Sequence, residues 1–215
     1  MTGHAWWNGR IVPFADATTS VAAFALHYGV GVFEGIRCYA RHDGRSAIFR
    51  LREHVMRLYD SANTCGFEIP FPPSTLEAAC AEVMRANALA EAYIRPVAFT
   101  AGSTLGLGAT TNPIEVAVLC WSWSNILGPE SLSKGIRVQT SSFVRGHMNA
   151  TMSKAKITGQ YIGSVLAKRE SQRLGFDDAL MLDADGRVCE ASAANLFVVH
   201  GGQVFTPPLD LAILA

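Results

Sequence analysis

The chain has 215 residues, of which 49% are hydrophobic and 17% charged, which fits a globular protein of one large domain or two small ones. Lysine plus arginine equals aspartate plus glutamate at 18 each, and the absence of basic runs and acidic tails argues against nucleic-acid or membrane-surface partners. The five cysteines are odd in number and lack metal-site spacing, so we expect no metal and reduced thiols in a cytoplasmic protein.

The first half of the chain predicts strands mixed with helices. Residues 6–12 indicate a hairpin with an Asn-Gly turn. Apolar spacing over 51–64 is helical, and a second helix is expected after a proline-rich break, with Ser74 as its N-cap and Glu77 at N3. Further strands are expected at 31–39, 47–49, 93–100 and 114–122.

The second half predicts a smaller α+β region. Composition shifts near residues 124–129, and a long helix is expected to begin near Lys156. Strands are expected at 136–141, on both sides of a turn at 183–186, and at 195–199. The sequence therefore predicts an α+β protein in three parts: an N-terminal α/β domain over 1–124, a linker over 125–132 and a C-terminal domain over 133–215.

Five motifs follow one another along the chain, at residues 26–39, 54–62, 92–96, 150–161 and 188–197. Together they resemble the fold-type IV pyridoxal-phosphate aminotransferases, and among these the branched-chain amino acid aminotransferases. The similarity extends from Trp7 to the last residue. It implies a two-domain fold like that of D-amino acid aminotransferase and the cofactor pyridoxal 5'-phosphate.

The resemblance assigns Lys156 as the lysine that forms a Schiff base with the cofactor and then acts as general base and acid. Lys154 is a close rival, but only Lys156 has the family's spacing to Gly159 and Tyr161. Without these flanks, a solvated lysine at a helix start would be the simpler interpretation. The resemblance assigns three more cofactor contacts: Arg57 to the phosphate, Tyr161 to the phenolate oxygen and Glu190 to the pyridine nitrogen.

The resemblance also implies a substrate pocket. Its expected residues are Tyr28, Phe33, Arg37, Tyr93, Arg95 and Trp123. Aromatic walls suit an apolar side chain, and Arg95 with Tyr28 suits the side-chain carboxylate of glutamate. Core packing is the alternative for each aromatic residue. The glycine-rich loop 102–108 is expected to complete the pocket of a partner subunit in a homodimer or larger homo-oligomer.

The chain departs from its family in several places. Ala194 replaces an acidic residue, Ile126 stands where relatives often have tyrosine, and Ile157-Thr158 replaces a small pair. The last two changes lie near the expected pocket and leave the preferred amino acid open. Relatives also continue into a Gly-Ile-Thr-Arg helix start that holds the phosphate. We therefore expect a truncated second domain, weak cofactor binding and poor transamination by this chain.

The leading hypothesis is transamination of leucine, isoleucine and valine with 2-oxoglutarate, giving 2-oxo acids and L-glutamate. A D-amino acid aminotransferase or aminodeoxychorismate lyase of the same fold is the nearest alternative, and Phe33-Glu-Gly-Ile-Arg37 favours the branched-chain group. A third hypothesis is a non-catalytic remnant that keeps a dimer-forming first domain, which the missing phosphate elements favour.

Overall fold

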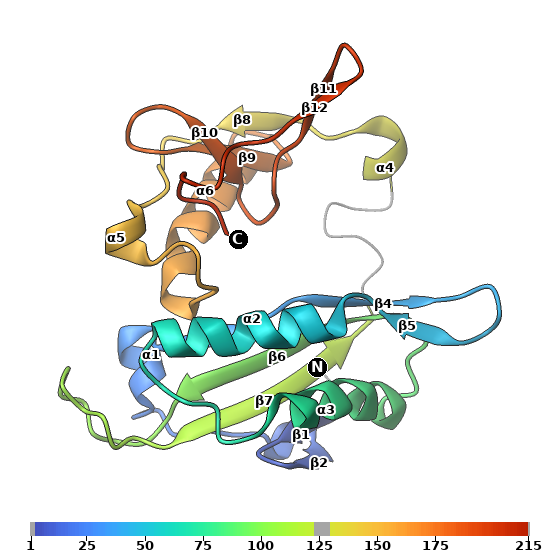
Figure 1. The fold of residues 1–215 in the computed structure, drawn as a ribbon, viewed down its shortest axis with the longest axis vertical. Coiled ribbons are helices and arrows are strands. Elements are labelled where there is room, and N and C mark those ends of the chain that lie inside the picture. Colours follow the sequence, from blue (N-terminus) through green and yellow to red (C-terminus); the bar gives the residue numbers. More distant parts are fainter. Residues whose placement is uncertain (1–2, 123–129, 215) are drawn as a thin grey trace. The chain divides into compact units, whose positions relative to one another are not determined.

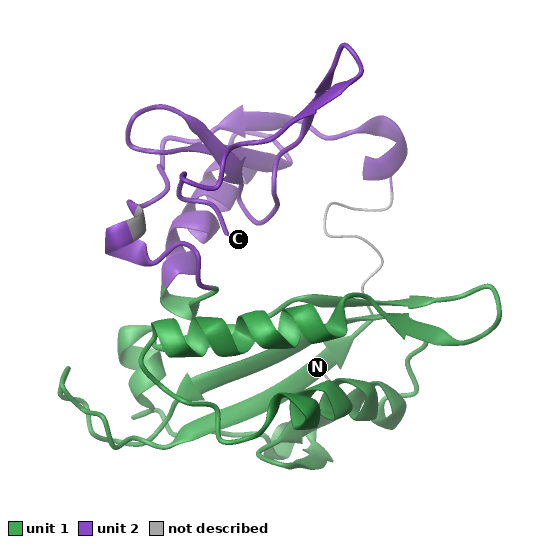
Figure 2. Cartoon of the chain, in the orientation of Figure 1, with its two compact units in different colours: residues 1–124, 156–159 green, residues 125–155, 160–215 purple. Residues whose placement is uncertain are grey.

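The computed structural model describes residues 3–122 and 130–214, and the backbone divides into two compact units (Figures 1 and 2). Unit 1 comprises residues 1–124 and 156–159, and unit 2 comprises residues 125–155 and 160–215. The sequence places 156–159 in the second domain, whereas the backbone groups this segment with unit 1. The separate folding of the expected domains stays a prediction.

Unit 1 is built on an antiparallel sheet of seven described strands in the order β2-β1-β7-β6-β4-β5, with β3 also paired to β6. The strands are β1 (His4–Trp7), β2 (Arg10–Pro13), β3 (Gly31–Phe33), β4 (Ile36–Ala40), β5 (Ser46–Ile48), β6 (Ala92–Thr100) and β7 (Ile114–Trp121). The predicted turn between β1 and β2 is confirmed: Asn8 and Gly9 both have positive φ, at 46° and 101°.

The strand predicted over 31–39 is in fact two strands, β3 and β4, which both pair with β6. Glu34 and Gly35 interrupt them, and the Glu34 N–H donates to the Pro96 carbonyl at 2.9 Å. The N–H and C=O of a strand residue point toward the same neighbouring strand. The position where Pro96 lacks an N–H therefore faces the interruption between β3 and β4. A proline in a central strand is tolerated here for that reason.

Three helices and a short 3-10 turn, η1 (Phe14–Asp16), accompany the sheet: α1 (Phe24–Tyr28), α2 (Leu51–Thr64) and α3 (Pro73–Ala86). The prediction of α2 is confirmed, with Val55, Leu58 and Ala62 buried on one face. The predicted start of α3 is wrong. Pro72 is the N-cap, without a side-chain cap bond, and Pro73 occupies the first helical position, where its fixed φ suits a helix.

Helices α2 and α3 cover one face of the sheet (Figure 1). The core between these helices and the sheet includes Val32, Ile36, Leu58, Leu76, Val83, Ile94, Val116 and Val118. Successive side chains of a strand point to opposite faces. Since Ala92, Ile94 and Ala98 of β6 face the core, Tyr93 and Arg95 lie on the face turned away from the helices.

Unit 2 contains a three-stranded sheet in the order β10-β9-β8, in which β8 is parallel to β9 and β10 antiparallel to it, and a separate β11–β12 hairpin. The strands are β8 (Val138–Thr140), β9 (Asp178–Leu182), β10 (Val188–Ala191), β11 (Val198–His200) and β12 (Gln203–Phe205). The strand pair around the turn at 183–186 is confirmed. The strands predicted at 136–141 and 195–199 are shorter than expected.

The helical segments of the second half are α4 (Ser131–Lys134), α5 (Met148–Thr151), η2 (Thr158–Gln160) and α6 (Tyr161–Arg173). Helix α6 packs on β9 through Ala167, Ala179 and Met181. The prediction that a long helix begins near Lys156 is wrong, because α6 begins at Tyr161. Residues 156–159 contact the rest of unit 1, and Thr158 and Gly159 belong to η2 rather than to α6.

Candidate active site

Lys156 lies on a short segment that is anchored to unit 1 by its backbone. Its N–H donates to Ser61 Oγ at 3.0 Å, and its carbonyl accepts the N–H of Phe33 at 3.1 Å. The Lys156 Nζ lies 5.1 Å from the centroid of the Phe33 ring, a cation–π distance. The amine is therefore placed beside β3 rather than on a helix surface.

The residues after Lys156 continue this anchoring. Thr158 Oγ1 donates to the Gly29 carbonyl at 2.8 Å, and the Gly159 N–H donates to the same oxygen at 3.1 Å. A Cβ on Gly29 would lie 2.6 Å from the Gly159 Cα, so only glycine allows this approach. Ile157 packs against the core of unit 1. Ile157 and Thr158, which differ from the family pattern, thus attach the lysine segment to unit 1. Their effect on the preferred amino acid stays a prediction.

The rival Lys154 belongs to unit 2 and has different partners. Its Nζ donates to the backbone carbonyls of Leu209 and of Leu211, the latter at 3.2 Å. An ammonium group held by two carbonyls is a structural tie for the chain that follows β12. The two lysines therefore lie in different surroundings, and the assignment of Lys156 as the cofactor lysine stays a prediction.

Arg57 is held by a buried acid that the sequence analysis did not single out. Glu34 is fully buried, and its carboxylate accepts Arg57 Nε at 2.6 Å, Arg57 Nη2 at 2.8 Å and His54 Nδ1 at 2.8 Å. This fork on a carboxylate fixes the guanidinium plane. A guanidinium has five N–H donors, so this geometry retains capacity for a second anion.

The charge of Glu34 is balanced by its neighbours. Burial alone would raise the pKa of Glu34, but hydrogen bonds from His54 and Arg57 and the charges of Arg57 and Lys156 outweigh burial and hold the pKa below 4.5. Glu34 is thus an anion between two cations expected to be functional. Glu34 belongs to the motif Phe33-Glu-Gly-Ile-Arg37, but the sequence assigned no role to this residue itself.

An aromatic wall lies on the face of the sheet that is turned away from α2 and α3. It consists of Phe33, Tyr93, Arg95 and Trp121. The Arg95 guanidinium carbon lies 4.5 Å from the centroid of Phe33, 5.3 Å from that of Tyr93 and 5.9 Å from that of Trp121. Arg95 Nη2 also donates to the Tyr93 hydroxyl at 3.1 Å. The wall joins one cation to three rings, and Trp121 is the member that the sequence analysis missed.

Gly35 makes room for this wall. A Cβ built there would lie 1.8 Å from the Tyr93 hydroxyl oxygen, so any side chain would displace Tyr93. Arg37 is paired in register with Tyr93 and lies over the Tyr39 ring at 5.4 Å. The structure therefore brings Phe33, Arg37, Tyr93 and Arg95 to one face of the sheet.

Tyr28 lies at the end of α1 and is exposed, and its hydroxyl donates to the Leu105 carbonyl at 2.6 Å. This bond ties α1 to the predicted loop 102–108, which contains no helix or strand. The role of this loop toward a partner stays a prediction. Trp123 and Ile126 lie outside the described residues.

The remaining predicted cofactor contacts belong to unit 2. Glu190 lies on β10 beside a register shift, and its Oε1 accepts Arg145 Nη2 at 2.8 Å. Tyr161 is the first residue of α6 and is partly buried. Arg145 was not among the residues expected from the sequence. Its only sequence signal is an arginine in the irregular stretch after β8.

Other kinds of site find no support in the described part of the chain. It contains no group of three histidine, cysteine or acidic side chains that could hold a metal ion. Burial raises the pKa of Cys80 to about 12 and those of Cys65 and Cys120 to about 11, so these thiols are protonated near neutral pH. Among the described residues there is also no helix of the length and apolar character that crossing a membrane requires.

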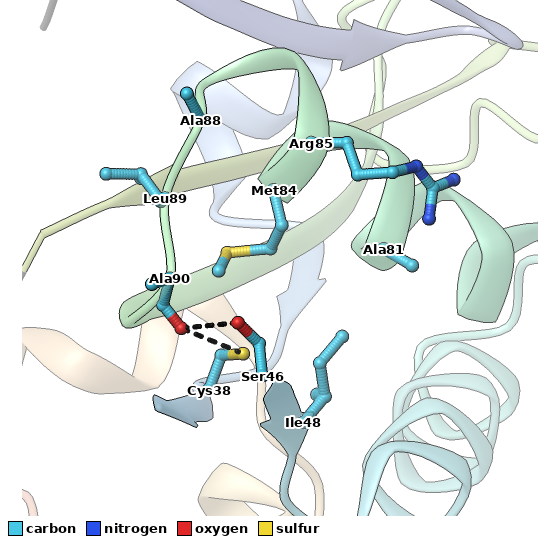
Figure 3. A pocket seen from close by; sticks show the side chains of 9 residues that line it. All are labelled: Cys38, Ser46, Ile48, Ala81, Met84, Arg85, Ala88, Leu89 and Ala90. Atoms are coloured by element: carbon cyan, nitrogen blue, oxygen red, sulfur yellow. Dashed lines mark hydrogen bonds between the residues drawn. The ribbon is translucent and has the colours of Figure 1, made fainter. Parts of the chain in front are cut away.

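A pocket of about 420 Å³ lies between α3 and the β4–β5 hairpin (Figure 3). The Ser46 hydroxyl donates to the Ala90 carbonyl at 2.8 Å, and the Cys38 thiol points to the same oxygen at 3.9 Å. The other lining residues are Ile48, Ala81, Met84, Arg85, Ala88 and Leu89. None of the predicted site residues lines this pocket, so we do not assign the chemistry to it.

Comparison with known proteins identifies the family. The model of the amino-transferase class IV family matches residues 31–215. The branched-chain-amino-acid aminotransferase of Pseudomonas aeruginosa is 43% identical over 211 residues, which cover 98% of this chain and 68% of that protein. That of Salmonella typhimurium is 40% identical over 212 residues, covering 97% of this chain and 68% of its own length.

Solved structures agree. The crystal structure of the branched-chain amino acid aminotransferase of Escherichia coli matches with a TM-score of 0.96 at 38% identity, covering 100% of this chain and 70% of that one. The T.th. branched-chain amino acid aminotransferase, complexed with N-(5'-phosphopyridoxyl)-L-glutamate, matches with a TM-score of 0.93 at 44% identity, covering 100% and 69%. These matches confirm the predicted fold-type IV class. The chain belongs to the class IV aminotransferase family.

Proposed function

We propose that the chain takes part in pyridoxal-phosphate-dependent transamination of branched-chain L-amino acids, with 2-oxoglutarate and L-glutamate as the second pair. The observation that carries the proposal is the placement of Lys156 beside Phe33 and the Glu34–Arg57 pair. The names of the relatives support the substrate class. The T.th. relative, complexed with a phosphopyridoxyl derivative of L-glutamate, supports the cofactor and the second substrate.

The side chains present fit pyridoxal phosphate by their chemistry. The group needs an amine for its aldehyde, a cation for its phosphate and an anion for its ring nitrogen. Lys156 supplies the amine, since the amine of its rival Lys154 is held by backbone carbonyls. Arg57 supplies a guanidinium whose plane Glu34 fixes, and Glu190 supplies a carboxylate on a strand.

When bound, the cofactor supplies an electron sink that acidifies the Cα–H bond of an amino acid. Lys156 Nζ would take the proton from the substrate Cα and deliver it to the C4′ of the cofactor, as general base and acid. Arg57 binds the phosphate dianion and fixes its position. Tyr161 donates to the phenolate oxygen, and Glu190 keeps a proton on the ring nitrogen through its negative charge.

The aromatic wall suits both substrates of a branched-chain enzyme. Phe33, Tyr93 and Trp121 offer apolar ring surface to a leucine side chain. Arg95 lies within that surface, and its Nε is buried without a hydrogen-bond partner among the described residues. A buried guanidinium donor gains from an anionic partner, which the side-chain carboxylate of glutamate supplies.

The test is chemical trapping of the cofactor on the 215-residue chain. Pyridoxal phosphate is added, the visible absorbance band is recorded, and borohydride reduction followed by peptide mass spectrometry locates the pyridoxyl group. We expect the group on Lys156 and a loss of both signals in Lys156→Ala. Lys154→Ala is the matched control and keeps both. Labelling of Lys154, or an unchanged band in Lys156→Ala, contradicts the proposal.

The substrate is tested on the same sample. Added L-leucine is expected to bleach the visible band in a single turnover, and 2-oxoglutarate to restore it. Bleaching by D-leucine but not L-leucine would favour a D-amino acid aminotransferase instead. This half-reaction needs no continuous turnover, so it remains informative if the chain turns over slowly.

We also propose a cytoplasmic location and a homo-oligomeric state. All five cysteines are free thiols in the structure, which suits a reducing compartment. Sedimentation of the purified chain tests the second part, and a mass that stays monomeric at all protein concentrations contradicts it.

A further inference from the structure

Arg145 contacts four separate parts of unit 2, three of them through its guanidinium. Its Nη2 donates to Glu190 Oε1 on β10 at 2.8 Å, and its Nη1 donates to Ser164 Oγ on α6 at 3.4 Å. Its Nε donates to the backbone carbonyl of Ala212 at 3.1 Å. Its own N–H donates to the Leu182 carbonyl at the end of β9 at 2.7 Å. One guanidinium thus joins a strand, a helix and the last described segment.

The Arg145–Glu190 pair is shielded from water, in contrast to the surface ion pairs of the described residues. The side chains are 16% and 9% exposed, whereas both members of the Lys134–Glu130 pair are 71% exposed. A shielded carboxylate that loses its cation is left as an uncompensated buried charge, which is strongly unfavourable. Such a group regains a proton or moves toward water.

The segment that Arg145 holds also packs behind Glu190. Cys189 precedes Glu190 on β10, and it forms a buried cluster with Leu211 and Ile213. Arg145 Nε binds the carbonyl of Ala212, between these two residues. The guanidinium therefore lies where the backbone of β10 and residues 211–213 meet. It fixes Glu190 directly through the ion pair and indirectly through the segment that packs against Cys189 of β10.

We propose that Arg145 is the positioning residue of the cofactor site: it keeps the Glu190 carboxylate ionised and fixed so that this carboxylate can hold the protonated ring nitrogen. The inference rests on the proposed function. A carboxylate has two oxygens and about four lone-pair sites, so pairing at Oε1 is compatible with a second cationic partner. Arg145 touches neither substrate nor cofactor in this role and acts through Glu190 alone.

A purely structural role would predict something else. If Arg145 only ties β10 to α6 and residues 211–213, its loss lowers stability without a specific change at the ring nitrogen. The two roles therefore differ in a spectroscopic property of bound cofactor, because the absorbance of the pyridine ring depends on protonation of its nitrogen. Stability alone does not separate them.

The experiment compares Arg145→Met, Arg145→Lys, Glu190→Gln and the double variant Arg145→Met/Glu190→Gln with the wild type of the full chain. Arg187→Met is the matched control. It removes an arginine of the same unit whose Nε binds Asp183 at 2.8 Å and whose side chain is 55% exposed. Circular dichroism of the cofactor-free proteins verifies folding. Absorbance titration then gives the pyridoxal phosphate affinity and the dependence of the bound band on pH.

We expect Arg145→Met and Glu190→Gln each to weaken cofactor binding about tenfold to hundredfold, the range for a charge-assisted hydrogen bond. Both variants shift the pH dependence of the bound band in the same direction. The double variant binds the cofactor no more weakly than the single variant with the lower affinity, because Arg145 acts through Glu190. Arg145→Lys restores part of the effect, because lysine keeps the charge but not the planar fork. Arg187→Met behaves as wild type.

Two results overturn the inference alone, and a third overturns it together with the proposed function. A folded Arg145→Met protein with wild-type affinity and pH dependence, beside a weakened Glu190→Gln, removes the positioning role and leaves the proposed function intact. Additive losses in the double variant do the same, since they show that Arg145 acts independently of Glu190. If the wild-type chain takes up no pyridoxal phosphate, the proposed function fails and the inference fails with it.

Discussion

Replacement of Glu34 by glutamine is the most direct test of how unit 1 holds its cations. The Glu34 carboxylate is fully buried and accepts four hydrogen bonds, two from Arg57, one from His54 and one from the Gly35 N–H at 3.3 Å. Glutamine has nearly the same shape but no charge. One of its two terminal groups is an NH2, which would point a donor at a donor.

The magnitude follows from these contacts. Hydrogen bonds to charged groups contribute about 1.5–3 kcal/mol each. The gain is reduced because burying a carboxylate is costly and because Arg57, whose side chain is 31% exposed, can be solvated once its partner is lost. With one acceptor retained, we expect the free energy of unfolding to fall by roughly 2–4 kcal/mol in Glu34→Gln.

The assay is urea unfolding followed by tryptophan fluorescence. All four tryptophans lie within the first 124 residues, so their fluorescence reports on unit 1. Glu53→Gln is the matched control on α2, since Glu53 pairs with Arg50 at 2.8 Å with side chains 57% and 65% exposed. Such a surface pair contributes only about 0–1 kcal/mol. If Glu34→Gln is no less stable than Glu53→Gln, the argument from burial is refuted.

Three further predictions concern the same unit. The pKa of Glu34 is lowered below 4.5, so its contribution to stability is complete above that pH and disappears as the pH falls through the folded-state pKa. In acid titrations of unfolding, the stability difference between wild type and Glu34→Gln should therefore shrink below pH 4.5. A difference that stays constant with pH would exclude this linkage. Gly35→Ala should displace Tyr93, change the near-ultraviolet circular dichroism and lower stability by about 1–3 kcal/mol, whereas Gly106→Ala, with open space around its Cβ, should leave the spectrum unchanged. Thr158→Val should cost about 1 kcal/mol and speed amide hydrogen exchange over 156–159, and unchanged exchange there would show that the hydroxyl does not anchor the segment.

Local patterns predicted the elements of unit 1 well because they are set by short-range chemistry. The Asn8-Gly9 turn needs two residues that tolerate positive φ, and the apolar spacing of α2 has one solution. The start of α3 was missed because Ser74 is a good N-cap in general, while Pro73 already fits the first helical position.

The errors around the site have a different origin. The helix expected from Lys156 begins later because Thr158 and Gly159 bind a carbonyl of Gly29, a residue far away in sequence. Glu34 and Arg145 were missed for the same reason, since each is defined by a partner that no local pattern reveals. The motifs indicated the proposed site residues, and the structure added the residues that contact them.

The placement of residues 156–159 with unit 1 has a consequence for dividing the protein. The chain passes from one unit to the other at 124/125, again at 155/156 and once more at 159/160. A fragment that stops at residue 124 contains the aromatic wall and Glu34 but lacks Lys156. The complementary fragment contains the lysine without the strand on which it rests. Neither half therefore carries Lys156 together with β3, and any single cut from 124/125 to 159/160 divides at least one of the two units.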